Sequence, residues 1–158
     1  GRDKCQDGHG NMWIKLMKCF TLDDAKSKEM DQSALVTVLA EALFLPSYAL
    51  QSYIAWQEAD SLSAKATLTY SGISVTGTFY FNEKGEFIRF ETDDRYQAGK
   101  GQTNRKVKWC AAASDYIEAD GIKFPTLLVA TWIDKDGRHD YFKGKIKRFE
   151  YNISQSKF

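Results

Sequence analysis

The sequence predicts an α+β domain, in which a curved antiparallel β-sheet of about six strands packs on one main helix. Three observations predict it: one stretch with helical periodicity, a long region of alternating apolar and polar residues, and an aromatic content of 14%. Aromatic side chains favour strands and fill wide cores. A chain of 158 residues has the size of one domain, so we expect residues 1–158 to fold as a unit.

The first expected element is a strand within residues 1–20, where an apolar run of strand length fills the second half. Residues 31–45 are expected to form the main helix, because apolar residues recur there at spacings of three and four. Asp31 or Ser33 is expected to cap its start. Pro46 disfavours helical geometry at the residue before it and so marks the end of the helix.

Residues 63–153 are expected to form an antiparallel meander, because alternating segments are separated by short clusters of Gly, Asn, Asp and Ser. Connections this short require antiparallel neighbours, since a parallel pair needs a crossover of a dozen or more residues. Gly77 and Gly144 fall within expected strands, where glycine often accompanies a bulge or sharp coiling. Residues 93–104 are polar and contain glycine, so we expect a long loop there.

The charge balance argues against a nucleic-acid partner. Lys and Arg together number 22 and Asp and Glu number 21, giving a formal net charge of +1. Proteins that bind phosphate backbones normally carry a basic excess or stripe. No apolar run approaches the roughly 20 residues that a membrane-spanning helix needs. The charged start of the chain does not read as a signal peptide.

The cysteines predict neither a disulfide framework nor a metal site. Cys5, Cys19 and Cys110 are odd in number and widely spaced, so we expect reduced thiols, with a Cys5–Cys19 bridge as the alternative. Unpaired cysteines without a signal peptide favour a cytoplasmic location. No CxxC, HExxH or Cys/His cluster predicts a metal, and no cofactor is expected.

No catalytic triad or dyad stands out, so no catalytic residue is assigned. Glu41 lies between two alanines on the expected helix, where it either faces solvent or points into the sheet and pairs with Arg89 or Arg95. An Arg fork suits a carboxylate or phosphate. The alternative for Arg95 is a local salt bridge with the neighbouring Asp93 or Asp94.

The tryptophans suggest a second kind of site. Trp56, Trp109 and Trp132 are spread along the chain but could converge in a curved sheet, together with Tyr116 and Tyr151. Such a cluster suits a pocket for an apolar or lipid-like ligand. An ordinary aromatic core is the favoured alternative, because aromatic side chains dominate cores. The candidate ligand-binding residues are Glu41, Trp56, Arg95, Trp109, Tyr116 and Trp132.

A basic run near the end of the chain has three interpretations. Lys143, Lys145 and Lys147 alternate along one face of the last expected strand. Such a run usually marks a solvated face or a protected sheet edge. Contact with phospholipid or another anion is the third interpretation.

Short motifs follow one another in a fixed order: Leu39-Ala40-Glu41-Ala42, Leu45-Pro46, Trp56, Asp94-Arg95, Trp109, Asp115-Tyr116, Gly121-Ile122-Lys123-Phe124-Pro125 and Trp132. Over roughly residues 30–152 they resemble an uncharacterised bacterial family, a domain of unknown function. The resemblance implies a fold similar to the half-barrel of lipoprotein-carrier proteins, which commonly holds an acyl chain. It also implies that this chain is the C-terminal part of a longer family architecture. It carries no catalytic role over.

Three functions remain open. A non-enzymatic scaffold that binds a lipid or other apolar ligand between sheet and helix ranks first. A structural or interaction module of a larger bacterial protein ranks second. An enzyme that uses Glu41 as acid and base, oriented by Arg95 and Tyr116, ranks third and requires those side chains to converge. The oligomeric state is left open.

Overall fold

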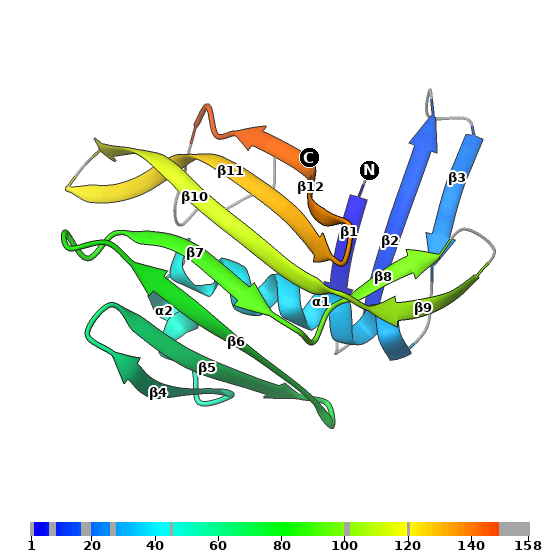
Figure 1. Ribbon diagram of the computed structural model, residues 1–158, viewed down its shortest axis with the longest axis horizontal. Coiled ribbons are helices and arrows are strands. Elements are labelled where there is room, and N and C mark those ends of the chain that lie inside the picture. Colours follow the sequence, from blue (N-terminus) through cyan, green and yellow to red (C-terminus); the bar gives the residue numbers. More distant parts are fainter. Residues whose placement is uncertain are drawn as a thin grey trace.

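One long helix crosses a face of an open antiparallel sheet, so the predicted α+β class is confirmed (Figure 1). The side chains described lie within residues 28–44, 48–97, 104–119 and 121–148. The backbone of the computed structural model is described for residues 2–6, 9–16, 20–25, 28–44, 46–99, 102–119 and 121–148.

The main sheet is an antiparallel meander, as predicted, and has seven strands rather than about six. From one edge to the other these are β12 (Gly137–Lys145), β11 (Ile122–Asp134), β10 (Lys108–Ala119), β7 (Phe87–Thr92), β6 (Ile73–Phe81), β5 (Ser63–Tyr70) and β4 (Ile54–Asp60). The strand that the sequence did not predict is β4. Only Ile54 is buried in it, so this edge strand lacks the apolar alternation that marks the others.

Residues 1–20 do not form a single strand, and that prediction was wrong. They contain β1 (Arg2–Gln6) and β2 (His9–Leu16), which form a separate antiparallel sheet with β3 (Phe20–Ala25). The strand β1 is almost wholly polar, so its sequence gives no hydrophobic period. The considered Cys5–Cys19 bridge lies outside the described residues, whereas Cys110 is a buried free thiol.

The expected long loop at residues 93–104 is instead a hairpin. Its strands are β8 (Tyr96–Gly99) and β9 (Gln102–Lys106), which pair with each other in a separate two-stranded sheet. This hairpin interrupts the meander between β7 and β10, and Figure 1 shows it projecting beyond the main sheet. Both strands are short and polar, which is why composition alone predicted a loop.

The main helix, α1 (Lys28–Glu41), begins three residues earlier than predicted. Glu29 and Asp31 occupy its first turn, where carboxylates interact favourably with the helix dipole. Ser33 is not a cap, because its hydroxyl donates to the carbonyl oxygen of Glu29 within the helix. The chain tightens into a 3₁₀ turn at Ala42–Phe44, and Pro46 then opens the short α2 (Pro46–Ala49), at the position proline favours.

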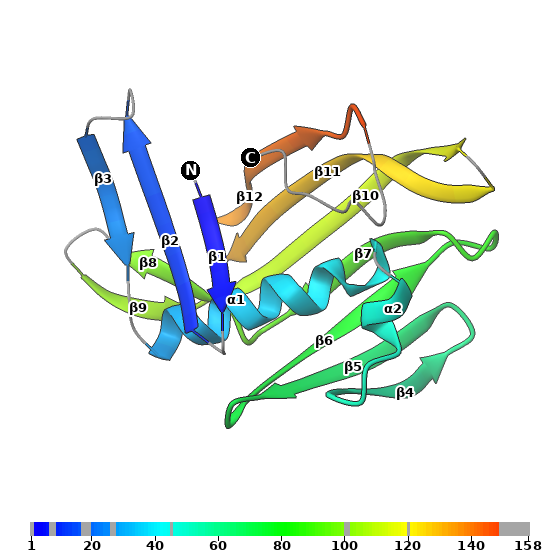
Figure 2. The same ribbon diagram turned by 180° about the vertical axis from the view of Figure 1, so that it is seen from behind.

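The core lies where α1 meets the main sheet. One side of α1 contacts β5 and β6, and another contacts β1 and β2, so the helix lies between the two sheets (Figure 2). The largest fully buried side chains are Phe79, Phe90, Leu39, Leu68, Val36 and Val75. Among the described residues, no helix is long and apolar enough to cross a membrane.

Candidate functional site: an apolar cavity beneath the helix

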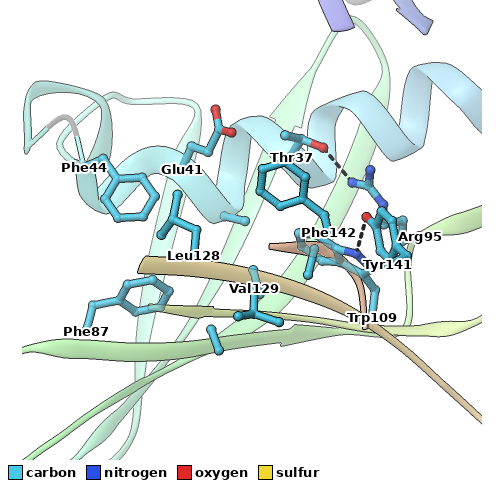
Figure 3. Close-up of a pocket in the computed structure, with 14 residues that line it drawn as sticks. Thr37, Glu41, Phe44, Phe87, Arg95, Trp109, Leu128, Val129, Tyr141 and Phe142 are labelled. Atoms are coloured by element: carbon cyan, nitrogen blue, oxygen red, sulfur yellow. Dashed lines mark hydrogen bonds between the residues drawn. The ribbon is translucent and has the colours of Figure 1, made fainter. Parts of the chain in front are cut away.

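A cavity of about 230 Å³ lies between α1 and the strands β10, β11 and β12 (Figure 3). It is hollow because small side chains line it on both sides. Ala111 and Ala130 pair on neighbouring strands of the sheet, and Ala40 lines the cavity from the helix. Its lining residues are Thr37, Ala40, Glu41, Phe44, Phe87, Arg95, Trp109, Ala111, Ala112, Leu128, Val129, Ala130, Tyr141 and Phe142.

Arg95 closes one end of the cavity and ties the helix to the sheet. Its Nη1 donates to the backbone oxygen of Ser33 at 2.9 Å and to the hydroxyl of Thr37 at 2.6 Å. The guanidinium lies 4.4 Å from the ring centroid of Trp109 and 5.8 Å from that of Trp132. Arginine over indole is a favourable cation–π arrangement. Arg95 therefore fixes the distance between α1 and β10, which sets the width of the cavity.

A β-bulge places two aromatic side chains at the mouth of the cavity. The register between β11 and β12 shifts at Tyr141, because Ala130 pairs with Phe142 while Thr131 pairs with Asp140. A bulge breaks the alternation of side chains along a strand and re-aims them. Tyr141 and Phe142 consequently both line the cavity although they are adjacent in sequence. Their exposures of 50% and 53% show that the cavity opens to solvent beside β12.

A hydrogen bond holds this mouth together. The indole Nε1 of Trp109 donates to the phenol oxygen of Tyr141 at 2.9 Å, and the Tyr141 ring stacks on Trp132 at 5.5 Å between centroids. Figure 3 shows Tyr141 and Arg95 at the same end of the cavity, with Trp109 beneath them. The buried indole N–H thereby has the partner that a buried donor requires.

Tyr116 lies at a smaller neighbouring cavity of about 60 Å³, where β10 separates from β7. The two strands pair only as far as Ala112 and Arg89. Beyond that point the phenol of Tyr116 donates to the carbonyl oxygen of Phe87 at 2.7 Å and so spans the gap. Burial and the nearby Glu86 carboxylate raise the pKa of Tyr116 to about 12.

The structure brings some of the candidate ligand-binding residues together and separates others. Arg95 and Trp109 line the larger cavity, and Trp132 packs beside them against Arg95. Trp56 lies elsewhere: it is on β4, with its Nε1 donating to the carbonyl oxygen of Ala49 at 2.7 Å and its ring against Phe79. The expected convergence of tryptophans therefore holds for two of the three.

The arrangement of Glu41, Arg95 and Tyr116 does not suit acid–base chemistry. Glu41 is solvent-exposed at the end of α1, and in Figure 3 its carboxylate points away from the cavity interior. Tyr116 lines the smaller cavity instead. General acid–base catalysis requires groups within hydrogen-bond reach of one reacting atom. Among the described side chains, no group of three or more His, Cys, Asp or Glu is placed to hold a metal ion.

The local interactions of the arginines also differ from the alternatives weighed. Asp94, considered as a partner of Arg95, instead forms a 3.0 Å ion pair with Lys106 and accepts the backbone N–H of Thr76. Arg89, considered as a partner of Glu41, lies 3.2 Å from Glu91 and over the ring of Tyr80. Its chain neighbour Phe90 is buried in the core beneath α1, so the alternation of side chains along β7 directs Arg89 to the opposite face of the sheet.

Residues that sequence reasoning missed form much of the cavity. The alanines of β10 and β11 do not indicate a site in the sequence, because the hollow arises only when these small residues pair across neighbouring strands. Tyr141 and Phe142 meet there because of a bulge in β12, the strand in which Gly144 indicated a bulge or sharp coiling without giving its position. On the opposite face, burial raises the pKa of the Cys110 thiol, which disfavours the reactive thiolate.

The fold and the site together define an α+β protein with an open antiparallel sheet and an apolar cavity beneath its helix. The chain belongs to DUF6544, a family of unknown function, whose family model matches residues 1–144. The expected membership of an uncharacterised family is thereby confirmed. No curated protein and no solved structure was found to match the chain.

Proposed function

We propose that this protein is a non-enzymatic binding protein that holds an apolar, lipid-like small ligand in the cavity between α1 and β10–β12. The observation that carries the proposal is the cavity itself, with about 230 Å³ of space and a lining dominated by alanine, aromatic and branched aliphatic side chains. Ligand sites typically combine such a lining with a few placed polar groups. Thr37, Glu41, Arg95 and Tyr141 are the polar lining residues here.

The volume limits the ligand. An engineered apolar cavity of about 150 Å³ accepts benzene, whereas drug-sized ligands occupy about 300–1,000 Å³. A space of about 230 Å³ therefore suits one ring or a segment of an acyl chain. Because the cavity opens beside Tyr141 and Phe142, the remainder of a longer ligand would extend past β12 into solvent.

Packing energetics favour a filled cavity. Apolar cavities cost about 24 cal/mol per Å³ left unfilled in a packed core. At that rate a volume of 230 Å³ corresponds to at most about 5.5 kcal/mol, a substantial part of ordinary domain stability. Part of this cost is relieved by the opening to solvent. A ligand that fills the space would make van der Waals contacts that the small alanine side chains do not make with one another.

The finer fold assignment belongs to the same proposal. We infer that the sheet is a curved half-barrel like that of lipoprotein-carrier proteins, with α1 lying in its concave side. The helix across one face of an open sheet and the short β7–β10 pairing support this inference. An enzymatic role finds less support, because Glu41 is exposed and Tyr116 is bonded to the backbone of Phe87.

The test is a titration with a neutral apolar dye whose fluorescence rises in an apolar site, N-phenyl-1-naphthylamine. The blocking variant is Ala111→Phe, because Ala111 lines the cavity and a phenyl group would fill it. The matched control is Ala55→Phe, since Ala55 is an exposed position on β4 away from the cavity. We expect saturable binding by the wild type and the control and at least a tenfold loss for Ala111→Phe. Equal binding by all three proteins would rule the cavity out as the site.

A further inference from the structure

The edge strand β12 and the residues that follow it concentrate positive charge. Residues 137–148 contain five basic side chains and one carboxylate, a formal charge of +4, while the whole chain carries +1. All five basic residues are exposed: Arg138, Lys143, Lys145, Lys147 and Arg148. The one carboxylate, Asp140, accepts a hydrogen bond from the hydroxyl of Thr131 at 2.7 Å.

The same strand exposes two aromatic side chains. Tyr141 and Phe142 are among the most exposed large apolar residues described, at 50% and 53%. Tyrosine and phenylalanine rings favour the boundary between lipid headgroups and acyl chains, and basic side chains favour anionic headgroups. Because both rings also line the cavity, the basic segment borders the cavity mouth.

Protection of the sheet edge explains only part of this pattern. Lysines on an edge strand prevent another strand from pairing with it, and β12 is an edge of the main sheet (Figure 1). Exposed rings on the same strand have the opposite effect, since they promote association. A phosphate-backbone partner would account for the lysines but gives no reason for two rings beside an apolar cavity. A membrane surface accounts for both.

We propose that residues 137–148, the β12 edge, dock the protein on an anionic phospholipid surface and bring the cavity mouth to the headgroup boundary. The docking goes beyond ligand binding and does not require a ligand in the cavity. Each basic residue near an anionic bilayer contributes about 1 kcal/mol, which is about fivefold in the partition coefficient. Removing three lysines should therefore weaken binding roughly a hundredfold.

The experiment is co-sedimentation of the full chain with vesicles of phosphatidylcholine alone and of phosphatidylcholine with 30% phosphatidylserine. The test variant is Lys143→Gln/Lys145→Gln/Lys147→Gln. The matched control makes the same charge change at Lys28, Lys65 and Lys84, which are exposed and lie on α1, on β5 and in the β6–β7 turn. Circular dichroism and urea unfolding confirm that all proteins are folded.

We expect salt-sensitive binding to the anionic vesicles only, a roughly hundredfold loss in the β12 variant and a change below about threefold in the control. Phe142→Ser should lower binding about tenfold, unlike Ile88→Ser at an exposed position on β7. Three results would each overturn the proposal: no wild-type binding, equal losses in both triple variants, or tighter binding to duplex DNA at equal phosphate concentration. Dye titration of the two triple-lysine variants distinguishes a loss of membrane docking from a loss of ligand binding, because the lysine changes should leave dye binding unaltered.

Discussion

Trp109 and Tyr141 join the floor of the cavity to its rim through one hydrogen bond, 2.9 Å long from the indole Nε1 to the phenol oxygen. Trp109 is almost wholly buried on β10, whereas Tyr141 is half exposed on the edge strand β12. The strands β10 and β12 are not neighbours in the sheet, and this hydrogen bond links them across β11. The bond fixes the position of the Tyr141 ring beside the opening.

Tyr141→Phe should destabilise the protein by about 1 kcal/mol, because the buried indole N–H of Trp109 loses its acceptor. Stacking of the ring on Trp132 is retained. Urea unfolding followed by tryptophan fluorescence measures the change. Tyr70→Phe is the control, since Tyr70 is exposed and its described contact is a ring contact with Tyr53. Equal stability of the two variants would mean that the Trp109 bond contributes nothing.

Tyr116→Phe should also destabilise the protein, and the difference from wild type should depend on pH. The pKa of Tyr116 is raised to about 12 in the folded chain from its ordinary value of 10.0. Between these values the unfolded chain releases the proton and the folded chain keeps it. The contribution of Tyr116 is therefore fully present below pH 10 and declines as the pH rises toward 12.

The measurement is urea unfolding of wild type and Tyr116→Phe at pH 8 and again near pH 11. We expect the stability advantage of the wild type to shrink or reverse at the higher pH. An advantage that stays constant or grows would contradict the raised pKa and the role of the phenol as a hydrogen-bond donor to Phe87.

Arg95 and Thr37 should be energetically coupled. The Nη1–Oγ1 hydrogen bond is 2.6 Å long and involves a charged donor, and such bonds are about twice as strong as neutral ones. A double-mutant cycle with Arg95→Met and Thr37→Val should give a coupling energy of about 1–2 kcal/mol. Additive effects of the two substitutions would show that the bond does not hold α1 against the sheet.

Gly77→Ala should destabilise the protein by about 2 kcal/mol through overpacking. A Cβ at Gly77 would lie 2.1 Å from the Phe90 ring and 3.0 Å from the backbone oxygen of Glu91, and Phe90 is fully buried. Gly144→Ala is the matched control in another strand. The three atoms nearest its Cβ would all belong to the ring of Phe142, which is half exposed and can rotate away. Thermal unfolding of both variants should separate them clearly.

The parts of the fold with strong local signals were predictable from sequence. The helix was predicted from its periodicity. Its start was predicted three residues too late, because Asp31 is a residue type that favours the cap position but lies within the first turn. The hairpin at Asn82 was found because its side chain suits a turn, and its oxygen accepts the backbone N–H groups of Lys84 and Glu86. The edge strand β4 was missed because only one of its residues is buried.

The candidate site was predictable only in part, because its geometry arises from pairing between strands. Trp109 and Arg95 stand out as residue types that build pockets, and both line the cavity. The hollow itself requires that Ala111 and Ala130 meet on one face, which depends on the register of β10 and β11. The bulge at Tyr141 likewise follows from the register of β11 and β12, which neither strand specifies alone.

Native mass spectrometry of freshly purified protein, followed by lipid extraction, tests the binding of an apolar ligand most directly. Wild type and Ala111→Phe are purified in parallel from the same host, so that both meet the same lipids. We expect the wild-type mass to exceed the chain mass by one small apolar molecule, recovered in the organic extract and absent from Ala111→Phe. A wild-type mass equal to that of the chain, together with no dye binding, would contradict the proposed function.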